Sequence, residues 1–195
     1  IYDDRGFSDN DDETLALLGD VIPEMHRVLR PGCHLYLFCG ISYRHKVNFN
    51  SIAEICDKAG FFVRTLPLIW CKSNIQGFKP PFTHWPLAYE AILFASTGKR
   101  ETDHIPSGDF LLHQPIAGTA KKHRFEKPIA LIQSLIKVSG VSDGRLLDPF
   151  CGSGSTLLAG RKTWMHVQGF DSDPQAFLTA RESLEKWDKE VLESN

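Results

Sequence analysis

The stretch at residues 146–160, LLDPFCGSGSTLLAG, holds residue types that suit a nucleotide-like ligand. Its two leucines are typical of the end of a buried strand, and Asp148 follows at the carboxyl end of that strand. Gly152 and Gly154 come next, and glycines there let backbone amides close on a ligand at the start of a helix. The pattern therefore predicts a cofactor loop between a strand and a small-residue helix.

A second carboxylate, Asp171, lies in the run HVQGFDSDP, after another strand-like segment. It follows Asp148 by roughly 20 residues, near the spacing at which doubly wound folds place an acid on ribose hydroxyls. The two acids thus predict one ligand site.

The glycine loop also has to be compared with loops of different function. A Walker-type phosphate loop is rejected because Gly154 is followed by Ser155 and Thr156 without the lysine. A dinucleotide fingerprint is disfavoured because Leu157 stands where a third glycine is needed. A purely structural glycine turn accounts for the glycines but for neither acid. The last two alternatives stay open at this point.

The loop resembles that of the S-adenosylmethionine-dependent amino-methyltransferases of DNA, which modify the exocyclic amine of adenine or cytosine. The family's loop reads Asp-Pro-Phe-x-Gly-Ser-Gly-Thr-Thr, and Ser155 is a conservative replacement here. The matching positions are Asp148, Pro149, Phe150, Gly152, Ser153, Gly154 and Thr156.

Two further elements resemble the same family. The run HRFEKP is similar to its His-x-x-x-Lys-Pro element, through His123, Lys127 and Pro128. The run GFDSDP is similar to its Gly-x-Glu-x-Asp-Pro element, with Asp171 in the acidic place. Segments 26–40, 68–74 and 88–98 are also similar, so the resemblance covers nearly the whole chain.

The resemblance implies an α/β, doubly wound, mostly parallel sheet with helices on both faces, the Rossmann-like fold of S-adenosylmethionine-dependent methyltransferases. Alternating helical and strand-like periodicity independently favours a doubly wound sheet. Helices are expected at about 15–29, 51–58, 129–139, 155–162 and 174–192, with strands at 33–40, 61–70, 88–96, 145–148 and 165–171. Asn50 or Ser51 is expected to cap the second helix, and Pro128 to lie in the first turn of the third.

One methyltransferase domain is expected over residues 1–195. Residues 1–98 form its catalytic or target half, 99–124 a connecting or DNA-contact loop, and 125–195 its cofactor-binding half, so the cofactor motif comes last in a permuted order.

The resemblance also implies roles for single residues, with S-adenosylmethionine as cofactor. Asp148 and the amides around Gly152 and Gly154 are expected to hold its methionine end, and Asp171 its ribose hydroxyls. Lys127 either pairs with the cofactor carboxylate or is a solvated loop lysine. Phe150 is expected to line the pocket. The predicted cofactor-binding set is completed by Pro128, Pro149, Ser153, Thr156 and Ser172.

The family's catalytic Asp-Pro-Pro-Tyr element is not found in the chain. The one Pro-Pro pair, Pro80-Pro81, stands between Lys79 and Phe82 and reads as a rigid loop, since it lacks an acceptor for the target amine. We expect the catalytic loop to lie upstream of Ile1. The catalytic residues are therefore unknown, and the chain alone is expected to be inactive.

Charge is unevenly distributed although the formal net charge is only −2. Residues 1–13 are acidic and do not suit a phosphate-facing surface, whereas 119–127 are basic. Solvated charge accounts for that basic segment equally well. Aromatic residues at 70, 78, 82 and 85 are either base contacts or core. The candidate DNA contacts are Lys72, Lys121, Lys122 and Arg124.

Composition points to an ordinary globular protein, with 42% hydrophobic and 24% charged residues. No apolar run approaches the length of a membrane span and no export signal is evident, so a cytoplasmic location is expected. The five cysteines and eight histidines show no ligand spacing, so we expect reduced thiols and no metal site. Self-association is expected if a sheet strand is left unpaired.

The favoured function is methylation of the adenine amine in DNA, ahead of the cytosine amine, within restriction-modification. One alternative is a non-catalytic cofactor- or DNA-binding remnant, or a fragment of a larger phage-like protein. Another is methylation of RNA or protein, because a fold alone does not set the substrate.

Overall fold

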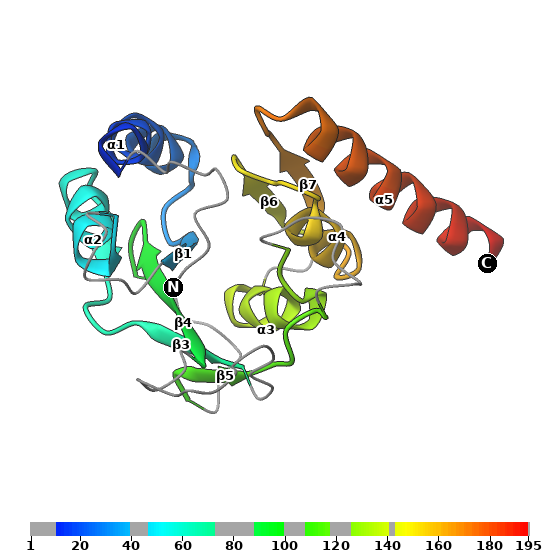
Figure 1. Ribbon diagram of the computed structural model, residues 1–195, viewed down its shortest axis with the longest axis horizontal. Coiled ribbons are helices and arrows are strands. Elements are labelled where there is room, and N and C mark those ends of the chain that lie inside the picture. Colours follow the sequence, from blue (N-terminus) through cyan, green and yellow to red (C-terminus); the bar gives the residue numbers. More distant parts are fainter. Residues whose placement is uncertain are drawn as a thin grey trace, which may run out of the picture. The chain divides into compact units, whose positions relative to one another are not determined.

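The computed structural model of the chain describes residues 11–39, 47–72, 88–99, 108–117, 126–140 and 143–194. Its backbone contacts divide the chain into two compact units. Unit 1 comprises Ile1–Cys71, Tyr89–Glu101 and Gly108–Leu111, and unit 2 comprises Lys72–Ala88, Thr102–Ser107 and Leu112–Asn195. Figure 1 labels most of the elements of both.

A five-stranded sheet, in the order β1-β4-β3-β5, is centred on β4 (Tyr89–Ser96). The other strands are β1 (His34–Cys39), β2 (Phe62–Val63), β3 (Leu68–Cys71) and β5 (Phe110–Leu112), with β2 also paired to β4. Strands β1, β2 and β3 each run antiparallel to β4. These three therefore share one direction, as the sequence predicted, but each pairs with the reversed β4, so the expectation of parallel pairing was wrong for them.

The single strand expected at 61–70 is interrupted. Val63 pairs with Ala95 and Leu68 with Ile92, so four residues of one strand face two of β4. Arg64 N still donates to the Phe94 carbonyl at 3.0 Å, but Pro67 has no N–H to continue the ladder. The extra residues form a bulge between β2 and β3.

Helices α1 (Asp11–Val28) and α2 (Phe49–Lys58) cover one face of this sheet (Figure 1). The side chain of Asn48 accepts from the amides of Asn50 and Ser51, and Ser51 Oγ accepts from Asn48 N, which makes a capping box. The predicted cap at Asn50 or Ser51 was therefore wrong. The core beneath the helices contains Ile22, Met25, Cys39, Ile52, Cys56, Phe61, Ala91, Leu93 and Ala95.

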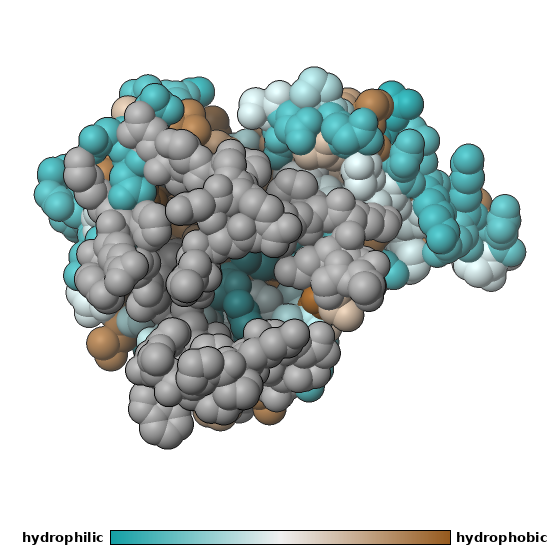
Figure 2. All heavy atoms as spheres, viewed as in Figure 1, coloured by the Kyte–Doolittle hydropathy of each residue, from teal (hydrophilic) through white to brown (hydrophobic). Residues whose placement is uncertain are grey.

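Unit 2 holds a parallel strand pair, β6 (Arg145–Asp148) and β7 (His166–Gly169), joined through α4 (Ser155–Arg161). A parallel pair needs such a crossover connection. Helix α4 also contacts α3 (Ile129–Ser139) and α5 (Pro174–Glu193). Figure 2 shows hydrophilic side chains gathered over α5, whose buried residues are Ala176, Ala180 and Ser183.

The described residues also bear on membrane and metal binding. None of their helices is long and apolar enough to cross a membrane, and they include no cluster of three potential metal ligands. Burial raises the pKa of the Cys39 thiol to about 11 and that of Cys56 to about 12, which keeps both protonated at neutral pH.

Leu93→Ala should destabilise the protein by about 2–5 kcal/mol, because the Leu93 side chain is fully buried between β4 and the helices. Leu66→Ala makes the same chemical change at a side chain that is 63% exposed, and should change stability by less than about 0.5 kcal/mol. Urea unfolding of both variants measures the difference. Equal losses would contradict the placement of the core.

Candidate cofactor site

Asp148 ends β6 and organises the loop that follows. Its Oδ1 accepts a hydrogen bond from Phe150 N at 3.0 Å, which closes a tight turn. The Thr156 side chain, in the first turn of α4, also hydrogen-bonds to this carboxyl. Asp148 lies at the carboxyl end of the strand, as the sequence predicted, and it links that end to the start of the helix.

Asp171 lies just beyond β7 and reaches the same loop. Its Oδ2 accepts from Gly152 N at 2.7 Å, and its Oδ1 accepts from Asp173 N at 2.9 Å. Backbone bonds from Cys151 N to Phe170 O, 2.9 Å, and from Phe170 N to Asp148 O, 3.0 Å, tie the two strand ends together. The structure thus brings both predicted acids to one place.

Burial and neighbouring groups shift the pKa of the Asp148 carboxyl. Burial raises the pKa of Asp148, and the negative charge of Asp171 raises it further, while hydrogen bonds from Thr156 and Phe150 N oppose these effects. Burial, with the two acids beside it, also raises the pKa of the Cys151 thiol to about 11. An acidic, partly buried site of this kind favours a ligand with hydroxyl donors and positive charge.

Gly154 serves packing as well as loop geometry. It caps α4 with φ of +82°, a conformation that favours glycine. A Cβ on Gly154 would lie 2.7 Å from the Ala180 Cβ of α5. Similarly, a Cβ on Gly160 would lie 2.7 Å from Val167 Cγ1 of β7. Sequence reasoning missed Gly160, although a glycine inside an apolar helical run signals such a close approach.

The remaining predicted cofactor residues fall into different environments. Phe150 is 46% exposed, Ser153 is buried and Ser172 is exposed. Pro128 is buried as the N-cap of α3, one position before the helix rather than in its first turn, and Lys127 is half-buried beside it. Pro149 and Thr156 are half-buried in the loop and the first turn of α4.

Most of the predicted DNA contacts lie outside the described residues, namely Lys121, Lys122 and Arg124, as do His123, Phe78, Phe82 and Trp85. Lys72 is described and half-buried, and its amide donates to the Ala88 carbonyl at 2.7 Å. Trp70 is 2% exposed and packs edge-on against Phe38. Trp70 is therefore a core residue and not a base contact.

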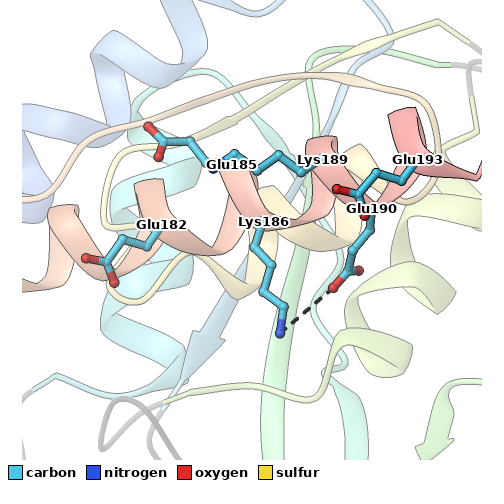
Figure 3. Close-up of a pocket in the computed structure, with 6 residues that line it drawn as sticks. All are labelled: Glu182, Glu185, Lys186, Lys189, Glu190 and Glu193. Atoms are coloured by element: carbon cyan, nitrogen blue, oxygen red, sulfur yellow. Dashed lines mark ion pairs between the residues drawn. The ribbon is translucent and has the colours of Figure 1, made fainter.

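A groove of about 410 Å³ lies elsewhere, along the outer surface of α5 (Figure 3). All six lining side chains are charged, and Lys186 pairs with Glu190 at 3.8 Å. Mixed charges along one exposed helix are typical of a solvated face. The groove holds neither of the two acids, so the candidate site remains at the ends of β6 and β7.

Comparison with known proteins identifies relatives that resemble this chain. Residues 108–182 match the family model described as DNA methylase. The curated type II methyltransferase M2.DpnII of Streptococcus pneumoniae is 27% identical over 156 residues, 71% of this chain. The chain spans 57% of the length of that relative.

Solved structures agree with this match. The M1.HpyAVI-SAM complex has a TM-score of 0.72 and 27% identity, over 89% of this chain and 84% of that one. These matches make the chain similar to the amino-methyltransferases of DNA and support that family. The cytosine-N4-specific PvuII DNA methyltransferase, 16% identical, shares the fold with a TM-score of 0.71 over 93% of this chain and 74% of that one. The α/β methyltransferase fold is thereby confirmed.

Gly154→Ala should destabilise the protein by about 2–4 kcal/mol, because alanine is strained at a positive φ and its Cβ collides with Ala180. Gly19→Ala is the matched control. Gly19 lies inside α1 with open space around it, so alanine there should stabilise by about 0.5–1 kcal/mol. Thermal unfolding of both variants tests the contrast, and a neutral Gly154→Ala would contradict the packing of α4 on α5.

The stability of Asp148→Asn relative to the native, ligand-free protein should increase as pH rises above 3.8, the ordinary pKa of this group. The raised pKa means that the folded state holds the Asp148 proton more tightly than the unfolded state, so native stability falls as pH rises from 3.8 through the raised value. Asparagine does not ionise. Urea unfolding of both proteins between pH 3.5 and 7.5 gives the difference, and a difference independent of pH would refute the expected shift.

Proposed function

We propose that this chain forms the cofactor-binding part of an enzyme that transfers a methyl group from S-adenosylmethionine to the exocyclic amine of adenine in DNA. The observation that carries the proposal is the meeting of Asp148 and Asp171 around a glycine loop. The bound cofactor supplies an electrophilic methyl group on a positively charged sulfur.

The residues present fit this cofactor. A carboxylate has about four acceptor positions, so Asp171, which accepts two backbone amides, retains capacity for ribose hydroxyls. Asp148 provides negative charge for the ammonium group of the methionine end, and Lys127 a positive charge for its carboxylate. Phe150, nearly half exposed beside the loop, offers an apolar surface to the ligand.

DNA is the proposed partner. An exocyclic amine is unreactive within the duplex, so the target base must leave the stack to meet the methyl group. Lys72 and the basic segment with Lys121, Lys122 and Arg124 are proposed to contact the DNA backbone. Adenine is preferred to cytosine on the resemblance of the motifs alone, and the relative's type II class suggests a role in restriction-modification. We place this reaction in the cytoplasm.

A non-catalytic cofactor-binding role is the second candidate, because the described site contains cofactor-type residues and no assigned catalytic group. Protein that carries this chain with its native flanking sequence separates the two roles. Incubation with DNA and tritiated S-adenosylmethionine, followed by nucleoside chromatography, should give N6-methyladenine. Label in N4-methylcytosine would change the proposed base, and cofactor binding without any transfer would support the non-catalytic role.

Calorimetry should show saturable binding of S-adenosylmethionine and of its demethylated product. Asp171→Ala should weaken binding by about 1.5–3 kcal/mol through loss of charged hydrogen bonds. Asp188→Ala removes a carboxylate from α5 that pairs with Arg161 and should leave the affinity unchanged. Unaltered affinity in Asp171→Ala would remove that residue from the ligand site.

A further inference from the structure

The glycine loop is held in shape by two carboxylates, Asp148 at the end of β6 and Asp171 just beyond β7. Asp148 accepts from Phe150 N, and Asp171 accepts from Gly152 N at 2.7 Å, a short distance for an amide donor and typical of a charge-assisted bond. Gly152 has φ of +50° and Gly154 of +82°. A loop with two such glycines needs hydrogen-bond partners to fix its shape, because glycine leaves the backbone many alternative conformations.

The second oxygen of Asp171 extends the connection to α5. It accepts from Asp173 N at 2.9 Å, and Asp173 in turn caps α5 by accepting from Gln175 N at 2.9 Å. The loop, the end of β7 and the start of α5 are thus joined through a single side chain.

We propose that Asp171 is a positioning residue that holds the glycine loop in its ligand-accepting shape before any ligand binds. The idea rests on the proposed function only for the identity of the ligand. One carboxylate then has two tasks, since it recognises the ribose and also places the loop that meets the rest of the cofactor. Its loss should weaken binding even of ligands that lack the ribose hydroxyls.

Asparagine is the sharpest replacement, because it keeps the size of Asp171 but has a single acceptor oxygen. Gly152 N and Asp173 N each donate to a different oxygen of the Asp171 carboxylate. Asparagine has one oxygen and no charge, so one amide faces an NH₂ group and the bond to the other loses its charge assistance. The bond at Gly152 N is therefore weakened in either orientation of the amide. Asp171→Asn should speed hydrogen exchange at Gly152 N at least tenfold in the ligand-free protein. It should also weaken binding of the 2′,3′-dideoxy analogue of S-adenosylhomocysteine at least threefold.

The control is Asp173→Ala, which removes the cap of α5 but leaves the bond between Asp171 and Gly152. Asp173→Ala should lower the melting temperature without changing the affinity for the dideoxy analogue. If Asp171 only stabilised the fold, Asp171→Asn would likewise lower the melting temperature and leave that affinity unchanged. Equal affinity of the native protein and Asp171→Asn for the dideoxy analogue would overturn the proposal.

Failure of the proposed function gives a different result. A native protein that binds neither S-adenosylhomocysteine nor its dideoxy analogue would contradict cofactor binding, yet exchange at Gly152 N would still test whether Asp171 holds the loop. If Asp171→Asn does not fold, exchange in the native ligand-free protein decides. Slow hydrogen exchange at Gly152 N supports the proposal that Asp171 holds the loop, and exchange at the rate of an unprotected amide overturns it.

Discussion

The parallel pairing of β6 with β7 is the constraint on which the candidate site depends. Asp148 pairs with Gly169, so Asp171 comes two residues beyond the same sheet edge. Carboxyl ends of parallel strands share one edge, and this brings together two acids that are far apart in sequence. A slip of one residue between β6 and β7 would shift Asp171 relative to the glycine loop and break its bond with Gly152 N.

Placing two carboxylates together carries an electrostatic cost that the loop only partly offsets. Backbone amides of Phe150, Gly152 and Asp173 and the Thr156 hydroxyl all donate to the pair. Even so, burial and the neighbouring charge leave the pKa of Asp148 raised. Local destabilisation of this kind is common where a site is built to bind rather than to stabilise the fold. It also explains why a ligand that carries positive charge suits the site.

Much of the site was predictable because its signals are local. Only a few residues separate the strand end at Asp148 from the glycines and from the helix that follows them. The periodicity of apolar side chains and the positions of glycines both depend on the local backbone conformation. The capping box at Asn48 was equally local, with Ser51 three residues on, and it was overlooked. Boundaries of most elements were predicted for the same reason, but the direction of β4 was not. Periodicity shows that a strand is half-buried and says nothing of its partner.

By itself, then, the sequence determined which residues form the loop, which acids flank it and where most of the elements begin and end. Tertiary structure decided what those residues contact. Position 154 must be glycine because a Cβ there would collide with Ala180 of a different helix. Trp70 is buried and packs against Phe38. The Asp171 carboxylate already accepts a hydrogen bond from Gly152 N. The physical reason is that hydrogen-bond partners and close packing depend on distances between segments remote in sequence, which arise only when the strands pair and the helices pack.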